Sequence, residues 1–332
     1  MKCVTDRRNL AEEIPLAVPF APMIEMSSYC NFACEFCPVS KKEDIKGTNF
    51  VRHHMEPELF KTIIDQLNEF PIIEGYPFKL YLNGGSESST HPQFVELIQY
   101  ATSKLKHRAN SFIIRTNGSL LTPDVSDKII EAGMTEINIS IEAVNGKGYE
   151  KVTHRKGMFQ RVLDNVTYLY NHRGNCRIYT KIIPLGTPET DKEEFFRIFG
   201  PISNMIDIEL PMFWSGSKRD VTLGKGIPER TVNDDPITPN VACPYIFYTL
   251  MISSMGLIHN CCFDIFDYID NGNVHENTLQ ELWGKGKMLE FWKLHLEGRR
   301  MEHPICSKCQ YVYGCPDFLS EEDRKNILER LK

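Results

Sequence analysis

Three cysteines lie close together in the stretch Cys30-Asn31-Phe32-Ala33-Cys34-Glu35-Phe36-Cys37, where their spacing is C-x3-C-x2-C. The stretch comes just after the strand-like segment Met23–Met26. Cysteine thiolate is the usual ligand of iron–sulfur clusters, so three thiols on one loop can bind three irons of a cubane. The fourth iron would then lack a protein ligand and could bind a small molecule. The stretch therefore predicts a catalytic metal site rather than a structural one.

A structural zinc site and a disulfide are the other interpretations of these cysteines. A structural zinc ion usually has four ligands in paired short spacings. Neither a histidine nor a fourth cysteine follows within the loop. A disulfide would leave one of the three thiols over. Both alternatives fit the three cysteines poorly, and the choice of an iron–sulfur cluster rests mostly on a family resemblance.

The spacing, with the aromatic Phe36 before the last cysteine, resembles the signature of the radical S-adenosylmethionine (radical SAM) family. The resemblance implies that Cys30, Cys34 and Cys37 bind a 4Fe–4S cluster, with Phe36 beside the cofactor. The open iron would chelate the amino and carboxylate groups of SAM. A reductant such as flavodoxin or ferredoxin would then drive cleavage of SAM to a 5′-deoxyadenosyl radical. That radical would take a hydrogen atom from the substrate.

Composition limits the classes of protein that the chain can belong to. The 332 residues are 42% hydrophobic, which suits one large or two modest domains with a real core. The net charge of -6 gives no indication of a nucleic acid or an anionic membrane as partner. The segment 1–8 is charged and no apolar stretch follows it, so we expect neither a signal peptide nor a membrane span. Eleven cysteines without an export signal suggest metal chemistry in a reducing cytoplasm.

Short apolar segments alternate with amphipathic helical patterns between residues 22 and 210. The candidate strands are Met23–Met26, Lys79–Asn83, Phe112–Arg115, Glu136–Ile141, Arg177–Ile183 and Ile206–Leu210. Such alternation predicts an α/β fold with a parallel sheet. The resemblance implies that the sheet curls into a partial (β/α)6 barrel, followed by a small cysteine-rich auxiliary cluster domain. Active sites of such barrels lie at the C-terminal ends of the strands, where the cysteine loop stands.

Three further residues match places that contact SAM in the family. Leu82-Asn83-Gly84-Gly85-Ser86-Glu87 resembles the Gly-Gly-Glu-type motif, and Glu87 would hold the SAM amino group. Ser86 and Ser88 stand where Gly and Pro are more usual, which puts the register in doubt. By the same resemblance Ser140 would contact the SAM ribose or carboxylate, and Arg155 would reach the carboxylate. A glycine turn with a solvated Glu, a strand-end hydrogen bond and a surface charge are the structural alternatives.

A second group of cysteines occupies the last third of the chain. The patterns are C-x12-G-x4-C from Cys243 to Cys261, and C-x2-C-x5-C through Cys306, Cys309 and Cys315. The spacing alone allows either zinc or a second cubane. The patterns resemble the SPASM/twitch extension of radical SAM enzymes, which binds auxiliary 4Fe–4S clusters. The resemblance implies one auxiliary cluster held by Cys243, Cys261, Cys306 and Cys309, with Cys315 as a possible replacement ligand.

These patterns divide the chain into four predicted regions. Residues 1–21 form an N-terminal extension, 22–214 the partial barrel and 241–332 the auxiliary cluster domain. Residues 215–240 are rich in Gly, Pro and Asp and are interpreted as a linker or a lid loop.

The favoured function is a radical SAM oxidoreductase that acts on a small polar substrate such as a sugar or aminocyclitol. Hydrogen abstraction would be followed by dehydrogenation, with the auxiliary cluster accepting an electron. Cys262, which follows a presumed ligand, could instead return a hydrogen atom and make the protein an epimerase. Its structural alternative is a buried small apolar residue. A peptide-modifying maturase and a non-enzymatic electron carrier are the remaining alternatives.

Overall fold

The computed structural model describes residues 8–76, 78–183, 189–209, 217, 236–237, 240–315 and 317–332. The predicted linker or lid at 215–240 therefore lies almost entirely outside the described residues. Within the described part, no helix combines the length and apolar character needed to cross a bilayer.

The strands form one 8-stranded sheet with the order β6-β5-β4-β3-β2-β1-β7-β8. Their bounds are β1 Ala21–Ile24, β2 Lys79–Tyr81, β3 Ser111–Thr116, β4 Glu136–Ile141, β5 Arg177–Ile182, β6 Met205–Ile208, β7 Thr249–Ile252 and β8 Ile258–His259. Neighbouring strands from β1 to β6 pair in parallel. The predicted α/β fold, a parallel partial barrel followed by a cysteine-rich region, is confirmed.

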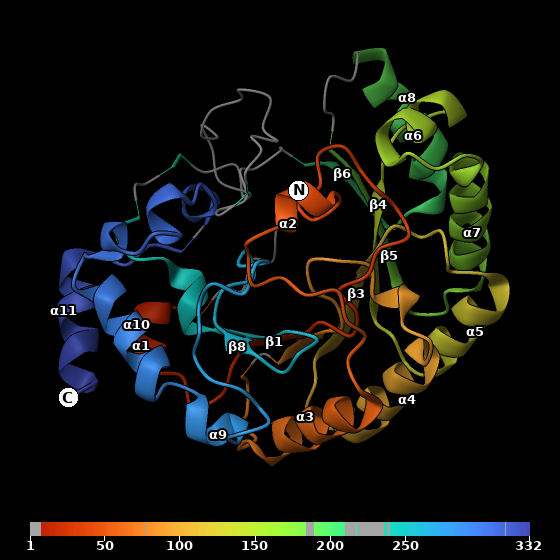
Figure 1. Ribbon diagram of the computed structural model, residues 1–332. Coiled ribbons are helices and arrows are strands. Elements are labelled where there is room, and N and C mark those ends of the chain that lie inside the picture. Colours follow the sequence, from red (N-terminus) through yellow and green to blue (C-terminus); the bar gives the residue numbers. More distant parts are fainter. Residues whose placement is uncertain are drawn as a thin grey trace.

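Helices cover the outside of the curved sheet, and α3, α4, α5 and α7 follow one another around its outer edge (Figure 1). The helices are α1 Leu10–Glu13, α2 Lys42–Ile45, α3 Pro57–Glu69, α4 Phe94–Leu105, α5 Pro123–Glu131, α6 Gly146–Thr153, α7 Met158–His172, α8 Glu189–Phe199, α9 Leu279–Leu282, α10 Gly286–Leu296 and α11 Glu321–Arg330. Short 3₁₀ turns join them: η1 Ser88–Thr90, η2 Gly200–Ile202, η3 Pro244–Phe247, η4 Arg300–Glu302, η5 Cys306–Lys308 and η6 Tyr311–Gly314.

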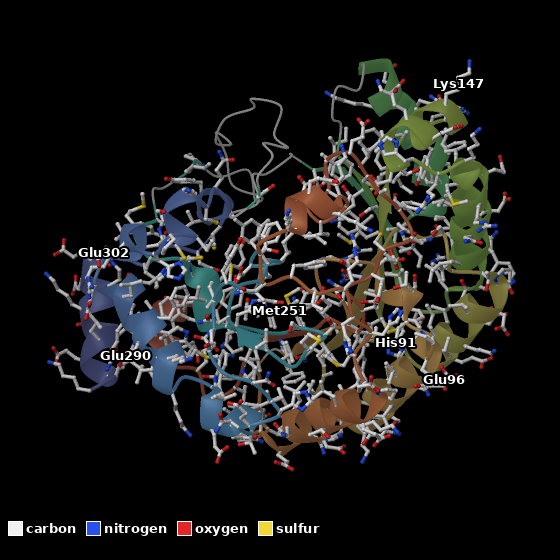
Figure 2. The ribbon with its side chains drawn as sticks, viewed as in Figure 1. His91, Glu96, Lys147, Met251, Glu290 and Glu302 are labelled. Carbon is white, nitrogen blue, oxygen red and sulfur yellow. The ribbon has the colours of Figure 1, made fainter. Side chains whose placement is uncertain are left out.

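Side-chain alternation explains how the sheet packs. On β4, Ile137, Ile139 and Ile141 are almost fully buried, as is expected of strand residues that face covering helices. The intervening Asn138 and Ser140 point to the opposite face, inside the barrel. In Figure 2, Met251 of β7 lies near the centre of the molecule, and charged residues such as Glu96 lie at its edge. The interior face of the sheet is therefore available for polar chemistry.

The cysteine-rich region extends the barrel sheet. No strand is predicted from the sequence beyond residue 210, yet β7 pairs in parallel with β1, in the register Ala21↔Thr249 to Ile24↔Ile252. The pairing continues past β1, because Glu25 N–H donates to the carbonyl of Ile252 at 2.9 Å. β8 then pairs antiparallel with β7. Both cysteine groups are thereby fixed to one sheet.

Candidate functional site

The first cysteine loop follows β1 and is held in place by its backbone. Ala33 and Glu35 donate N–H groups to the carbonyls of Thr153 and Val152, both at 3.0 Å. These carbonyls belong to the last turn of α6, where such groups lack partners within the helix. The loop therefore docks on a helix end, and its conformation does not depend on the thiols alone.

The three thiols of this loop lie near one another. Burial raises the pKa of Cys30 to about 12, and the charges of Glu87 and Cys37 add to the increase. Burial also raises the pKa of Cys34, followed by the charges of Glu142, Cys37 and Cys30. Each thiolate thus opposes the formation of the next. Bound iron, being cationic, would relieve this repulsion, so the donor set fits a cluster with three cysteine ligands.

Glu87 is buried, and its carboxylate is already surrounded by donors. It accepts hydrogen bonds from the Thr116 hydroxyl at 2.7 Å, from Asn117 N–H at 2.6 Å and from the Ser89 hydroxyl at 2.5 Å. Its own N–H donates to the carbonyl of Tyr29 at 3.0 Å. Burial raises the pKa of Glu87, while these donors act in the opposite direction. Glu87 thereby ties the ends of β2 and β3 to the cysteine loop, and contact with SAM remains a prediction.

The structure also places the other predicted SAM contacts at this end of the sheet. Arg155 donates from Nε to the carbonyl of Asn31, inside the cysteine loop, at 2.7 Å. Asn31 is also held by its side chain, which accepts from Asn117 Nδ2 at 2.8 Å. Ser140 is half-buried on the interior face of β4, and Phe36 is half-buried in the loop. Their roles toward SAM remain predictions.

Glu25 is a residue that the sequence analysis missed. It is 6% exposed, and it accepts from Gly85 N–H at 3.2 Å and from Ser254 N–H at 3.3 Å. Burial, reinforced by the charge of Asp267, raises its pKa to about 7. A Cβ atom at Gly84 would lie 2.5 Å from the Glu25 Cβ, so any other residue there would force the Glu25 side chain or the backbone to shift. Through these two hydrogen bonds Glu25 connects the barrel to the cysteine-rich region. The sequence feature that could have indicated this role is a glutamate within the otherwise apolar segment Met23–Met26.

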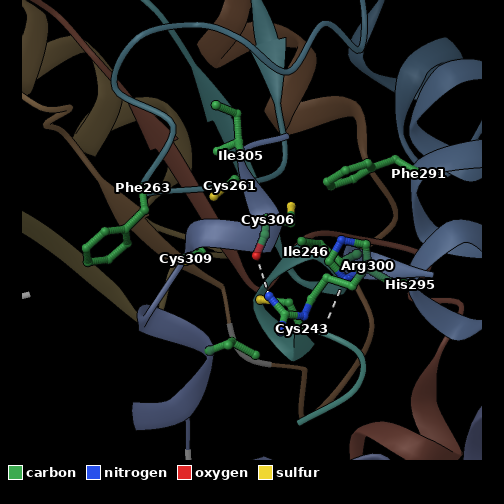
Figure 3. A pocket seen from close by; sticks show the side chains of 11 residues that line it. Cys243, Ile246, Cys261, Phe263, Phe291, His295, Arg300, Ile305, Cys306 and Cys309 are labelled. Atoms are coloured by element: carbon green, nitrogen blue, oxygen red, sulfur yellow. Dashed lines mark hydrogen bonds between the residues drawn. The ribbon is translucent and has the colours of Figure 1, made fainter. Parts of the chain in front are cut away.

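The second cysteine group lines a small cavity (Figure 3). Its lining includes the four cysteines that the family resemblance indicated as ligands, which are Cys243, Cys261, Cys306 and Cys309. Burial raises the pKa of Cys243 well above its usual value. The charges of Cys309, Cys315 and Cys306 raise this pKa further. Four thiols that the chain brings together from distant segments fit a metal-binding site.

A single zinc ion and a cubane place different demands on these four thiols. A zinc ion would draw its sulfurs to about 2.3 Å from one point. A cubane binds one cysteine at each iron and keeps the thiols farther apart. The four thiols are the donor set that a cubane needs.

Cys315 and Cys262 lie outside the ring of cavity-lining thiols. Cys315 is buried, and its thiol donates to Asp317 Oδ2 at 3.9 Å. Its charge acts on Cys243, so it lies close to the cavity. Burial raises the pKa of Cys262 to about 11, with Arg115 acting in the opposite direction. A role for Cys315 as ligand and for Cys262 in catalysis remain predictions.

Polar groups gather on the barrel interior between the two cysteine regions. Arg115, on β3, lies over the ring of Tyr81 at 5.0 Å, and the charges of Tyr311, Cys262 and Glu209 act on it. No hydrogen bond of its guanidinium to a described residue is present. Arg115 belongs to the barrel and Cys262 to the cysteine-rich region. Their interaction shows that the two regions meet on the barrel interior.

A second set of interior groups lies on β5 and just after the ends of β4 and β6. Lys181 Nζ and Glu209 Oε2 form an ion pair at 2.8 Å. Burial raises the pKa of Glu142 to about 7; the charge of Lys181 lowers it and that of Glu87 raises it. The charge of Glu142 also acts on Cys34. A carboxyl that exchanges its proton near neutral pH thus stands close to the first cysteine loop.

Two family models match the chain. The model of the radical SAM superfamily matches residues 24–199, which is more than half of the chain. The chain belongs to the radical SAM superfamily. A second model, SPASM, described as an iron–sulfur cluster-binding domain, matches residues 243–310. The predicted membership, with its C-terminal auxiliary cluster domain, is confirmed.

Curated proteins that resemble this radical SAM chain have names that indicate different activities. It is 30% identical to an uncharacterised protein of Methanocaldococcus jannaschii over 54% of this chain, and it covers only 40% of that protein. It is 21% identical to the tungsten-containing aldehyde ferredoxin oxidoreductase cofactor-modifying protein of Pyrococcus furiosus, over 90% of this chain and 89% of that one. It is 22% identical to the S-adenosyl-L-methionine-dependent 2-deoxy-scyllo-inosamine dehydrogenase of Niallia circulans, over 87% of this chain and 92% of that one.

Solved structures share the fold of this radical SAM chain. BtrN in complex with AdoMet and 2-DOIA matches with a TM-score of 0.57 and 19% identity, over 92% of this chain and 97% of that one. The protein anSMEcpe with bound AdoMet matches with a TM-score of 0.60 and 14% identity, over 94% of this chain and 98% of that one. The protein is a radical SAM enzyme whose cofactors are a SAM-binding 4Fe–4S cluster, SAM and an auxiliary iron–sulfur cluster, and both cysteine sites fit these groups.

Proposed function

We propose that the protein dehydrogenates a small polar substrate of the sugar or aminocyclitol type, converting a secondary alcohol to a ketone. This oxidation removes one hydrogen atom from carbon, one proton from oxygen and one electron. When bound, the cofactors supply a carbon-centred radical that takes the hydrogen atom and an auxiliary cluster that takes the electron. The residues of this chain must therefore hold the substrate, exclude water and accept the proton.

The observation that carries the proposal is the polar interior between the two cysteine sites. The guanidinium of Arg115 can donate to substrate oxygens, because the structure leaves it without a hydrogen-bond partner among the described residues. Tyr81 beside it offers an aromatic surface to a sugar ring. The charges of Arg115 and Cys262 act on each other, so a substrate held here would reach from the barrel toward the auxiliary site.

Glu142 is the group best suited to accept the substrate proton. Its pKa near 7 lets it exist as a carboxylate at neutral pH and still bind a proton. Lys181 favours that carboxylate form through its charge. Arg115 cannot fill this role, because a guanidinium stays protonated in proteins. The proposed base thus stands on the same interior face as Ser140, one strand away from Arg115.

The names of two relatives support this choice of substrate class. The Niallia circulans protein is a SAM-dependent 2-deoxy-scyllo-inosamine dehydrogenase, and BtrN has been crystallised with AdoMet and 2-DOIA. The low identities carry the fold only, so the substrate must be tested directly. A small electron carrier such as flavodoxin or ferredoxin is the proposed reductant.

The test is an anaerobic assay of the reconstituted protein with SAM, reductant and 2-deoxy-scyllo-inosamine or a matched set of sugars. A ketone product formed together with 5′-deoxyadenosine, and lost in Arg115→Met, supports the proposal. Deuterium at the reacting carbon of the substrate should appear in 5′-deoxyadenosine. Formation of 5′-deoxyadenosine with a product of unchanged oxidation state would overturn dehydrogenation.

Epimerisation is the second candidate, and the position of Cys262 favours it. Cys262 directly follows the predicted ligand Cys261, so its thiol would stand beside the auxiliary cluster and could return a hydrogen atom to a substrate radical. Tyr311 and Arg115 lie around this thiol on the interior side. Turnover in deuterated water separates the candidates: solvent deuterium at the reacting carbon, lost in Cys262→Ala, indicates epimerisation. A peptide-modifying activity would need a peptide to be consumed in the same assay.

A further inference from the structure

Two buried nitrogen-bearing side chains, His295 and Arg300, line the cavity of the second cysteine site beside Cys243 and Cys306 (Figure 3). His295 is fully buried in the last turn of α10, and Arg300 is 5% exposed at the start of η4. The family patterns concern cysteines and glycines, so neither residue is explained by them. Their hydrogen bonds show what they can offer to a group in the cavity.

His295 has one ring nitrogen occupied and one without a partner. Nδ1 lies 3.1 Å from the N–H of Cys243, which donates to it. A ring nitrogen that accepts a hydrogen bond carries no proton, so the proton of neutral His295 is on Nε2. Nε2 is buried and has no hydrogen-bond partner among the described residues. His295 therefore provides a buried donor that has no acceptor among the described residues.

Arg300 is a buried cation in the same position. One terminal nitrogen donates to the carbonyl of Cys306, whereas Nε is buried without a partner among the described residues. No ion pair joins Arg300 to a carboxylate in the described part of the chain. A buried charge is costly unless an anion compensates it. The cavity that Arg300 lines is therefore the place where an anion is expected.

We propose that His295 Nε2–H and Arg300 Nε–H donate to sulfurs of the auxiliary cluster and raise its reduction potential. A cubane bound by four thiolates is an anion, and reduction adds one more negative charge. A nearby cation and hydrogen-bond donors stabilise the reduced form more than the oxidised form. The auxiliary cluster thereby becomes a better electron acceptor. This use of the electron rests on the proposed dehydrogenation, but the potential itself does not depend on any substrate.

Arg324 offers a matched control for Arg300. It donates to the carbonyl of Leu296 at 2.9 Å, and its buried Nε likewise lacks a partner in the part of the chain that the structure describes. It lies on α11 and does not line the cavity. Arg300→Gln and Arg324→Gln therefore both remove a guanidinium that donates to a backbone carbonyl, although Arg324 is only half-buried. Only the first removes a cation from the cysteine cavity.

The first experiment is a potentiometric titration of the reconstituted protein without substrate, followed by electron paramagnetic resonance. The auxiliary signal is assigned in a variant whose Cys30, Cys34 and Cys37 are alanine. Arg300→Gln should lower the auxiliary reduction potential by at least 59 mV. For one electron this corresponds to a tenfold change in the reduction equilibrium. Arg324→Gln should leave it unchanged, and neither variant should move the SAM-binding cluster. Equal auxiliary potentials in Arg300→Gln and the wild type would overturn the proposal.

A structural role for Arg300 is tested separately. If Arg300→Gln fails to retain the auxiliary cluster, Arg300→Lys keeps the charge and allows the same measurement. The proposal expects Arg300→Lys to hold the cluster at a potential close to that of the wild type. The role of the charge would be contradicted if the auxiliary potential in Arg300→Lys fell by the 59 mV or more expected for a neutral residue.

The donor from His295 has its own direct readout. His295→Asn can keep an acceptor near Nδ1 but removes the Nε2 donor, whereas His295→Gln can keep a donor near Nε2. Pulsed electron paramagnetic resonance of protein labelled with ¹⁵N-histidine should show a nitrogen coupled to the reduced auxiliary cluster. His295→Asn should abolish this coupling and lower the potential, and His295→Gln should retain most of the potential. Absence of the coupling in the wild type would refute the hydrogen bond, whatever the substrate proves to be.

Discussion

The two cysteine sites differ in how the chain assembles them. Cys30, Cys34 and Cys37 come from one loop, which is docked on the end of α6 by backbone hydrogen bonds. The second site gathers four thiols from three separate segments, around a cavity that contains a buried cation. The first has one ligand too few for a cubane and can accept SAM. The second gathers four predicted ligands, which suits a group that only exchanges electrons. Local spacing therefore brings the first set of thiols together, whereas the second set depends on tertiary structure.

The largest effects are expected from removing each set of ligands in turn. Alanine at Cys30, Cys34 and Cys37 should remove half of the iron and sulfide and reduce SAM cleavage to background. Alanine at Cys243 and Cys261 should remove the other half of the iron but leave SAM cleavage, now uncoupled from ketone formation. Metal analysis and 5′-deoxyadenosine release provide the measurements. Loss of both clusters in both variants would show that the sites do not fold independently.

Substitution of Glu142 tests whether the substrate loses its hydroxyl proton near the first cysteine site. Because its pKa lies near 7, turnover should rise with pH through about 7 and level off above it. Glu142→Gln should lower turnover by about 10²-fold or more and remove this rise. Glu136→Gln, on the same face at the other end of β4, is the control and should retain the wild-type profile. A rise at pH 7 that persists in Glu142→Gln would assign the proton to a different group.

Glu25 tests the connection between the two regions. Its pKa is raised from 4.5 to about 7, so the folded protein holds a proton that the unfolded chain releases. The apo-protein should therefore lose up to about 3 kcal/mol of unfolding free energy as pH rises from about 4.5 to about 7. Denaturant titrations across this range should show a shallower loss for Glu25→Gln. The exposed Glu96→Gln should keep the wild-type slope, and equal slopes in all three proteins would rule out this account.

Gly84 gives the smallest expected effect. An alanine Cβ would lie 2.5 Å from the side chain of Glu25, so one of the two must shift. Gly84→Ala should cost about 1–3 kcal/mol of unfolding free energy. Gly146, at the start of α6, has no atom within 4 Å of such a Cβ. Gly146→Ala should therefore be neutral or slightly stabilising, and a similar loss in both variants would indicate a general sensitivity to glycine replacement.

Much of the barrel and the first cysteine site could be predicted from sequence, because both depend on local patterns. The predicted strand Glu136–Ile141 has the same bounds as β4. Its alternating apolar residues and the helical patterns on either side of it define both ends. β7 was missed because its parallel partner, β1, is more than 200 residues away, and β8 was missed with it because β8 pairs only with β7. The role of Glu25 depends on the N–H groups of Gly85 and Ser254, which only the folded chain brings together. For the same reason His295 and Arg300 left no local signal.

The pairing of β7 with β1 also determines how the chain can be shortened. If the chain ended after β6, the hydrogen-bonding groups of β1 on that side would have no partner. An uncovered strand edge of this kind readily pairs with another molecule and leads to aggregation. The C-terminal region thus protects the first strand as well as contributing thiols. We expect that the radical-forming half of this protein will not remain dispersed when expressed by itself.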